Sequence, residues 1–215
     1  MKIIFDDDRE IVSKEDGETT ETYRLDTADA FKLITKAYLR CGWDNKYVYG
    51  FSWLGRPIIQ LPDDLVRLQE LIYVVKPDLI IDIGVAHGGS LVFEAGLLRL
   101  MGKGRVVGVD IEIRQHNRRA LQEHDLYPLI TLIESDSICE KTVKQVAQMI
   151  KSNDVVLVFL DGCHEKDHVT QELEIYSQFV SVGSYIVAMD GIMEELVGAP
   201  RANDDWADNN PAAAS

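Results

Sequence analysis

The 215-residue sequence is poor in cysteine and in positive charge. Its three cysteines, Cys41, Cys139 and Cys163, are widely spaced and form no Cys-x-x-Cys pair. This argues against a disulfide framework or a cysteine-rich zinc site and favours a reducing cytoplasm. The 22 Lys and Arg residues face 36 Asp and Glu residues, so the formal net charge is −14. Because phosphate binding draws on surplus positive charge, we expect no general nucleic-acid binding and no binding to anionic membranes.

Long apolar runs are also absent. No window approaches 18 uninterrupted apolar residues, and the first eight residues contain no basic region followed by an apolar stretch. The sequence therefore predicts neither a membrane span nor a secretory signal. Hydrophobic residues make up 46% and charged residues 27%, which is typical of a globular protein. An acidic surface of this kind suits a neutral or cationic small-molecule acceptor, or a protein partner.

The first 50 residues differ in composition from the rest. Residues 1–22 carry eight acids and three bases, which predicts a mobile or weakly ordered arm, or an arm that docks on a partner subunit. A helix is expected from the N-cap candidate Thr27 to about Gly42, with Phe31, Ile34 and Tyr38 on one face. We therefore expect residues 1–50 to form an acidic arm and helix used in oligomerisation, and residues 51–215 to form the main domain.

The main domain alternates between helical and strand patterns. A helix is expected from Pro62 to Lys76. Beyond it, helical patterns separate five short apolar runs rich in β-branched residues, at 79–83, 105–110, 129–133, 155–160 and 184–189. This alternation predicts an α/β fold of right-handed βαβ units, with a mostly parallel, Rossmann-like sheet and helices on both faces.

A glycine-rich segment follows the first run. Gly84, Gly88 and Gly89 let the backbone turn tightly and approach a ligand, Ala86 lies in the same turn, and Ser90 is placed to cap the next helix. In such sheets, ligands bind beyond the carboxyl ends of the strands. The spacing is Gly-x-x-x-Gly-Gly and not the Gly-x-Gly-x-x-Gly of dinucleotide binding, so a plain strand-to-helix turn stays an alternative.

Polar residues also close the second and third runs. Asp110 is placed to accept hydrogen bonds from both hydroxyls of a ribose, or else to cap the next helix. Asp136 and Ser137 follow the third run and could meet the edge of an adenine, or cap a helix. Together with the glycine-rich turn they predict a site for an adenosine-bearing ligand without a phosphate clamp. S-adenosylmethionine fits that description better than a nicotinamide dinucleotide.

The fourth and fifth runs end in acids. Asp161 and Asp190 close adjacent runs and could share one hard divalent ion such as Mg²⁺. His164, three residues after Asp161, could take a proton from a substrate hydroxyl near neutral pH. The alternative makes both acids caps and His164 a surface residue. His168 is assigned to the following helix, and Cys163 has no obvious separate base for a nucleophilic role.

Several motifs in order give a resemblance to a known family. They are Trp53-Leu-Gly-Arg, Gln60-Leu-Pro-Asp-Asp-Leu, Lys76-Pro-Asp-Leu-Ile-Ile-Asp-Ile-Gly84, Gly88-Gly-Ser90, Val109-Asp-Ile-Glu-Ile-Arg114, His116-Asn-Arg118, Asp136-Ser137 and Leu160-Asp-Gly-Cys-His164. Over residues 50–190 the chain resembles the cephalosporin hydroxylase-like family. That family resembles class I S-adenosylmethionine-dependent methyltransferases and includes O-methyltransferases acting on macrolide sugars and rhamnosyl groups. Its members are homo-oligomers whose N-terminal segments take part in assembly.

The resemblance implies roles for individual residues. Gly84, Gly88, Gly89 and Ser90 would cradle the methionine part of the cofactor, Asp110 would hold the ribose, and Asp136 with Ser137 would lie near the adenine. Asp161 and acids after the fifth strand would hold Mg²⁺, and His164 would be the base.

The chain departs from the family pattern at two places. Met189-Asp190 stands where metal-binding relatives carry an acidic pair, so one metal ligand is missing. Class I methyltransferases have seven strands, and the 25 residues after Asp190 are too few for the last two. We therefore expect these strands to be missing, either by truncation or because a partner covers the edge of the sheet.

Methyl transfer from S-adenosylmethionine to a hydroxyl of a sugar or glycosylated metabolite is the leading hypothesis. Two alternatives stay open. One is a cofactor-binding or assembly protein of the same fold without catalysis, which the missing strands and Met189 favour. The other is a nicotinamide-dependent oxidoreductase, against which the absence of Gly-x-Gly-x-x-Gly counts.

Overall fold

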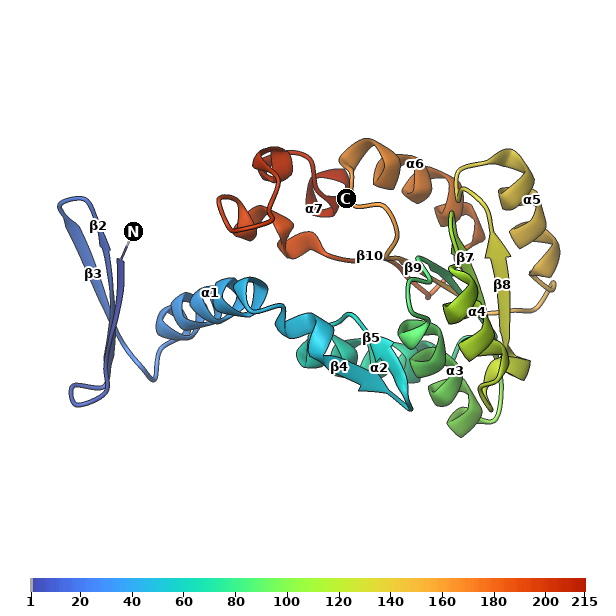
Figure 1. Ribbon diagram of the computed structural model, residues 1–215, viewed down its shortest axis with the longest axis horizontal. Coiled ribbons are helices and arrows are strands. Elements are labelled where there is room, and N and C mark those ends of the chain that lie inside the picture. Colours follow the sequence, from blue (N-terminus) through green and yellow to red (C-terminus); the bar gives the residue numbers. More distant parts are fainter. Residues whose placement is uncertain (1) are drawn as a thin grey trace.

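The centre of the computed structural model, which describes residues 2–215, is a five-stranded parallel sheet (Figure 1). Its strands are β6 (Leu79–Ile83), β7 (Arg105–Asp110), β8 (Ile130–Glu134), β9 (Val156–Leu160) and β10 (Ile186–Ala188). They lie in the order β10-β9-β6-β7-β8, and each neighbouring pair is parallel. The five predicted runs are therefore the five strands.

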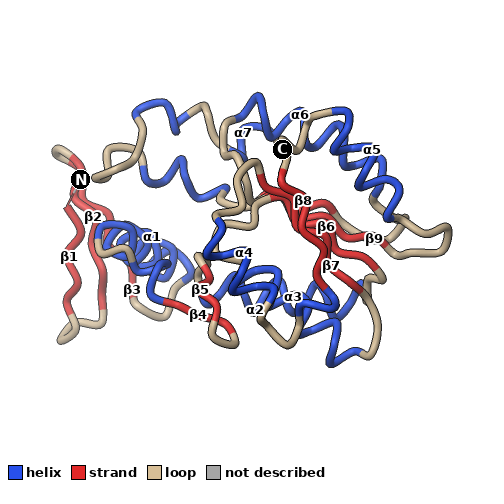
Figure 2. The backbone as a smooth tube through the Cα atoms, turned by 45° about the vertical axis from the view of Figure 1, so that its right-hand side comes forward, coloured by secondary structure: helices blue, strands red, loops and turns tan. Residues whose placement is uncertain are grey.

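Helices cover both faces of this sheet, as predicted (Figure 2). α2 (Pro62–Val75), α3 (Gly89–Met101) and α4 (Gln115–Gln122) pack on one face. α5 (Glu140–Met149) and α6 (Lys166–Tyr176) pack on the other, with a short 3-10 turn at Ser177–Phe179, whereas the 3-10 turn Tyr127–Leu129 packs on the first face. All five residues of β6 and of β9 are buried, because both faces of these central strands are covered.

The order of the strands reverses beside β6. β6 pairs with β7 on one side and with β9 on the other, so Ile83 lies in register with both Val109 and Leu160. The loops that follow β6 and β9 therefore emerge at the same edge of the sheet. The connections after these two strands run in opposite directions, which makes this edge a topological switch point. This edge carries the residues after Ile83 and Leu160.

The N-terminal segment is ordered, contrary to the weakly ordered arm expected from its acidity. β1 (Lys2–Asp6), β2 (Ile11–Asp16) and β3 (Thr19–Arg24) form an antiparallel sheet that projects from the main domain (Figure 1). Its order has a physical cause, because Val12 is fully buried against Ala30 and Leu33 of the following helix. Its strands show no regular alternation of apolar and polar residues, so the sequence pattern carried no clear strand signal here.

The first helix, α1 (Ala28–Asp44), confirms the predicted N-cap. The Thr27 side chain accepts a hydrogen bond from the Ala30 N–H. Ala30 and Leu33 are buried, whereas Phe31 is 71% exposed. The small N-terminal sheet covers only a narrow stripe of the helix, so the wider apolar face stays open.

Two short elements connect α1 to the main domain. A 3-10 turn (Tyr47–Gly50) leads into a hairpin of β4 (Phe51–Trp53) and β5 (Arg56–Ile58). The hairpin packs on α3, where Trp53 and Phe93 make an edge-to-face contact with ring centroids 4.9 Å apart.

The chain after β10 forms turns and a short helix. These elements are η4 (Gly191–Leu196), η5 (Asp204–Ala207) and α7 (Pro211–Ala214). α7 returns to α6, where the Asn209 side chain accepts a hydrogen bond from the Lys166 N–H. Residues 2–215 contain no strand after β10, as expected. In the same residues, no helix has the length and apolar character needed to cross a membrane.

Candidate functional site

A cavity of about 850 Å³ opens at the switch-point edge of the sheet. Residues of the loops after β6, β9 and β10 line it, together with residues of α1, β5 and α2. Five of the predicted cofactor-binding residues belong to one turn at this cavity. Gly84, Ala86, Gly89 and Ser90 line the cavity, and Gly88 lies in the same turn without lining it. This cavity thus coincides with the predicted ligand-binding edge.

The glycines of the first turn are required by close backbone packing. Gly84 has φ +119°, and a Cβ there would lie 2.2 Å from the carbonyl oxygen of Asp161. A Cβ on Gly89 would lie 2.2 Å from the carbonyl oxygen of Pro57 in β5. The turn is therefore clamped between the β9 loop and the hairpin, which places its backbone at the cavity wall.

Ser90 does not cap α3, contrary to expectation. The N-cap position is Gly88, and the Ser90 hydroxyl instead donates to Oδ2 of Asp82 at 2.8 Å. Ala86 is a non-glycine residue with φ +43° at the tip of the turn. Left-handed backbone at such a residue costs free energy, so the surrounding contacts hold it in place.

The carboxylate of Asp110 bonds to the glycine-rich turn. Its Oδ2 accepts hydrogen bonds from the N–H groups of Val85 at 2.8 Å and Ala86 at 3.0 Å, and its Oδ1 accepts one from Glu112 at 3.1 Å. Asp110 does not line the cavity. A carboxylate offers about four acceptor sites, so one stays available to a ligand hydroxyl.

Asp136 and Ser137 also lie outside the cavity. Asp136 Oδ1 accepts from the Ile138 N–H at 3.1 Å. Ser137 is buried, and its hydroxyl donates to Oε1 of Glu172 in α6 at 2.5 Å. His168, which lies in α6 as expected, has its Nε2 3.1 Å from the same Glu172 oxygen. The hydroxyl of Ser137 is thus turned toward α6.

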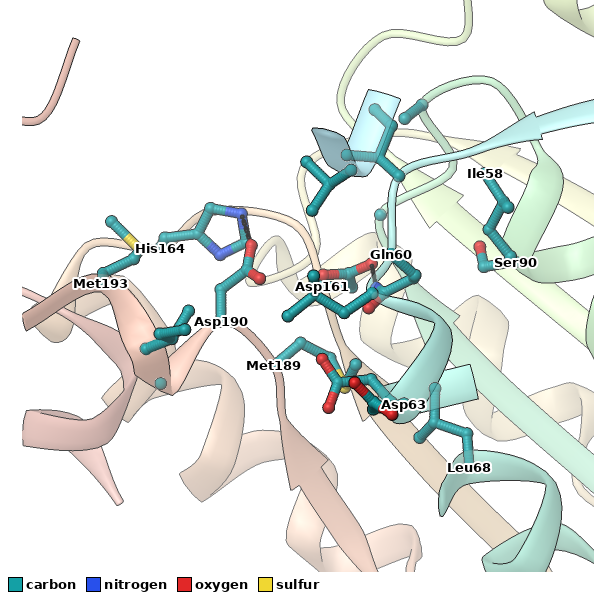
Figure 3. Close-up of a pocket in the computed structure, with 18 of the residues that line it drawn as sticks. Ile58, Gln60, Asp63, Leu68, Ser90, Asp161, His164, Met189, Asp190 and Met193 are labelled. Atoms are coloured by element: carbon teal, nitrogen blue, oxygen red, sulfur yellow. Dashed lines mark hydrogen bonds and ion pairs between the residues drawn. The ribbon is translucent and has the colours of Figure 1, made fainter. Parts of the chain in front are cut away.

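Asp161, His164 and Asp190 come together, although they follow different strands. One donor atom from each lies within 4.8 Å of the others, and His164 Nε2 is 3.2 Å from Asp190 Oδ2 (Figure 3). Two carboxylates and an imidazole form a donor set that suits a divalent cation. Met189 lies in the cavity wall and offers no oxygen, so Asp161 and Asp190 are the carboxylates that the predicted metal site can use.

Further carboxyl groups are buried behind this group. Burial raises the pKa of Asp82 to about 7 and raises the pKa of Glu94 well above its usual range. Burial, and then the charges of Asp190 and Asp82, raise the pKa of Asp161 in the same way. Oδ1 of Asp82 and Oε2 of Glu94 have no hydrogen-bond partner. The buried carboxyl groups behind the cavity wall therefore favour bound protons or a nearby cation.

Three positioning residues were not identified from the sequence pattern. Gln60 donates to Asp161 Oδ2 at 3.0 Å. Arg56 donates to the carbonyl oxygen of His87, and Asn117 donates to that of Ala86 at 2.9 Å, so both brace the glycine-rich turn. All three lie within the motifs that carry the family resemblance, which was the available signal.

A family model for "Rhamnosyl O-methyltransferase/CmcI" matches residues 45–215. A rhamnosyl O-methyltransferase of Mycobacterium bovis is 29% identical over 155 residues, which cover 68% of this chain and 61% of that protein. The chain thus spans about three fifths of the length of this relative.

Solved structures show the same fold. An O-methyltransferase from Bacillus cereus in complex with SAH aligns with a TM-score of 0.52 at 16% identity, over 80% of this chain and 73% of that one. CmcI with Mg and SAM aligns with a TM-score of 0.50 at 19% identity, over 67% of this chain and 59% of that one. The five-stranded parallel sheet is that of a class I methyltransferase. The match over most of its length places this chain in the rhamnosyl O-methyltransferase/CmcI family.

Proposed function

We propose that the protein transfers a methyl group from S-adenosylmethionine to a hydroxyl of a sugar or glycosylated small metabolite, with the assistance of Mg²⁺. One observation carries the proposal. Asp161, His164 and Asp190 gather beside the glycine-rich turn, in one cavity at the switch point, in a member of this family. The names of the relatives, a rhamnosyl O-methyltransferase and a CmcI structure with Mg and SAM, support the same reaction.

The cofactor would lie along the carboxyl ends of β6, β7 and β8. Gly84 and Ser90, which line the cavity, support a place there for its methionine part, with Gly88 and Gly89 in the same turn. The remaining acceptor site of Asp110 supports its assignment to the ribose. Asp136 and Ser137 do not line the cavity, so their assignment to the adenine rests only on their position directly after β8.

When bound, S-adenosylmethionine supplies an electrophilic methyl group, and Mg²⁺ supplies a Lewis acid that makes the acceptor hydroxyl easier to deprotonate. Asp161 and Asp190 would hold that ion. His164 takes the proton of the acceptor hydroxyl on Nδ1, because its Nε2 lies 3.2 Å from Asp190 Oδ2 and donates to that carboxylate, which orients the imidazole. The cavity walls hold the acceptor oxygen in line with the methyl group, so that alignment contributes to the rate.

Assembly and location complete the proposal. We propose a homo-oligomer formed through residues 1–50, which the exposed apolar side chains of Phe5 and Phe31 support. The three free cysteines support a reducing cytoplasm.

The test is calorimetric titration of the protein with S-adenosylhomocysteine, with and without Mg²⁺. Micromolar binding would support the cofactor site, and its absence in a folded sample would overturn the proposal. Mg²⁺ titrations of Asp161→Asn and Asp190→Asn should show weakened metal binding, whereas Asp167→Asn, an exposed acid of α6, should match the unaltered protein. Binding of the cofactor product without methylation of any rhamnoside would favour a non-catalytic role.

A further inference from the structure

The end of the cavity that faces α1 is lined by aromatic side chains. These are Tyr38 and Trp43 of α1, Tyr47 and Tyr49 of the 3-10 turn, and Trp206 of η5. The ring centroids of Tyr38 and Tyr47 lie 5.8 Å apart, and those of Trp43 and Trp206 lie 5.5 Å apart. Tyr38 is 43% exposed and Tyr49 is 56% exposed. Open ring faces in a cavity suit a ligand with an apolar or aromatic ring surface.

This aromatic wall is held in place by contacts between distant parts of the chain. Trp43 Nε1 donates to the carbonyl oxygen of Pro200 at 2.6 Å, and Arg40 donates to that of Gly198 at 2.7 Å. Lys36 of α1 pairs with Glu195 of η4. The segment after β10 therefore lies against α1, and the wall exists before any ligand binds.

The same cavity is negatively charged. Its lining carboxylates are those of Asp63, Asp64, Asp161 and Asp190. Among the described lining residues, the side chain with a permanent positive charge is Arg67, which is exposed and donates to Glu70 at 2.7 Å. Burial, and then the charges of Asp190 and Asp63, raise the pKa of Asp64, which reflects this crowding of acids. With Mg²⁺ held by Asp161 and Asp190, the carboxylates of Asp63 and Asp64 would still repel a diphosphate, and Arg67 is already paired with Glu70.

We infer that the acceptor places an apolar or aromatic ring against Tyr38 and Tyr47, and that it is a neutral or cationic glycoside and not a nucleotide diphosphate sugar. This inference rests on the proposed methyltransferase function. The inference also places methylation after glycosyl transfer. The glycosyl transfer releases the nucleotide and supplies the glycoside that this protein methylates.

The test compares three probes by calorimetry on the full chain saturated with S-adenosylhomocysteine and Mg²⁺. They are p-nitrophenyl α-L-rhamnopyranoside, methyl α-L-rhamnopyranoside and TDP-rhamnose. We expect the nitrophenyl glycoside to bind about tenfold more tightly than the methyl glycoside, and TDP-rhamnose to bind most weakly at low ionic strength. Tightest binding of TDP-rhamnose, or no binding of any probe to the cofactor-loaded protein, would overturn the inference. Failure to bind S-adenosylhomocysteine would overturn the proposed function and this inference with it.

Two variants with matched controls locate the effect. Tyr38→Ala should weaken binding of the nitrophenyl glycoside about tenfold. The affinities for the methyl glycoside and for S-adenosylhomocysteine should stay unchanged. Its control is Tyr73→Ala, since Tyr73 is 61% exposed on α2 and does not line the cavity. Asp63→Asn should strengthen TDP-rhamnose binding several-fold, whereas Asp29→Asn, at an exposed site of α1 outside the cavity, should not. Equal effects of a variant and its control would contradict the assignment.

Discussion

The imidazole Nε2 of His164 lies 3.2 Å from the carboxylate Oδ2 of Asp190. The two residues are 26 positions apart and follow adjacent parallel strands, β9 and β10, whose carboxyl ends meet at one edge of the sheet. Both side chains line the cavity. A base oriented by a carboxylate, at the mouth of a site with a second carboxylate on Asp161, is the arrangement from which the proposed proton transfer follows.

Replacing His164 tests that proton transfer. His164→Ala should lower turnover of a methyl acceptor by roughly 10²–10⁴-fold, the usual contribution of a general base. Affinity for S-adenosylhomocysteine should stay within about twofold, because the histidine lies beyond the glycine-rich turn. His116→Ala, on the exposed surface of α4, is the control. Equal loss of turnover and of cofactor affinity would show a structural histidine, and loss of Mg²⁺ binding would show a metal ligand.

The buried acid Asp82 makes folding stability depend on pH. The pKa of Asp82 rises from 3.8 to about 7 on folding, chiefly by burial. Between these values the folded protein retains a proton that the unfolded chain has lost. The contribution of Asp82 to stability is therefore complete below pH 4 and is lost as the pH rises through about 7.

Asp82→Asn removes this titration while leaving an acceptor for Ser90. Without Mg²⁺, the variant should match the unaltered protein near pH 4 and unfold at a higher temperature at pH 8, by roughly 2–4 °C for each kcal/mol gained. Scanning calorimetry from pH 4 to pH 8 measures the difference, with Asp167→Asn as the exposed control. Parallel pH profiles of the Asp82 variant and the unaltered protein would contradict the prediction.

Two glycines of α3 should respond in opposite ways to alanine. A Cβ on Gly89 would meet the Pro57 carbonyl oxygen at 2.2 Å, whereas a Cβ on Gly96 would make ordinary contacts at 3.6 Å and beyond. Gly89→Ala should cost about 1–3 kcal/mol by overpacking. Gly96→Ala should be neutral or stabilise by up to about 1 kcal/mol, since alanine favours the helix interior. Denaturant unfolding compares them, and similar losses in both would disprove the clamp on the turn.

The tip of the same turn offers a stabilising change. Ala86 has φ +43°, a conformation that glycine adopts at lower cost. Ala86→Gly should raise the free energy of unfolding by about 0.5–1 kcal/mol. It should not weaken binding of S-adenosylhomocysteine, because the backbone N–H at position 86 still donates to Asp110. Thermal unfolding and calorimetric titration together check both parts. A lower unfolding temperature would show that the methyl group of Ala86 makes a contact worth more than the strain.

Local pattern was sufficient to find the elements of the main domain. Each strand begins or ends within two residues of its apolar run, because fully buried strands such as β6 and β9 must be apolar on both faces. The N-terminal sheet was missed because its strands carry mostly polar and charged residues and bury little more than Val12. The sequence pattern placed Phe31, Ile34 and Tyr38 on one face of α1 but could not show that Phe31 stays exposed, since periodicity shows that a helix has an apolar face but not whether a neighbour covers it.

For the site, the sequence indicated which residues carry the chemistry but not which of them lie close together. The acids and the histidine after β9 and β10 could be picked out because strand ends in a parallel sheet share one edge. Gln60 and Glu94 could not, since their importance comes from burial beside Asp161 and Asp82. The aromatic wall was also out of reach, because Trp43 and Trp206 are 163 residues apart and meet only after both ends of the chain fold onto the cavity.

Order along the chain therefore specified the sheet, its helices and the residues at its ligand-binding edge, since periodicity and strand-end chemistry are local properties. Packing between distant segments settled the rest: the clamp on the glycine-rich turn, the buried carboxyl groups, the 3.2 Å contact of His164 with Asp190 and the aromatic end of the cavity. The reason is physical. Burial and charge repulsion depend on which atoms surround a group in space, and those neighbours are set by the tertiary fold and not by adjacency in the chain.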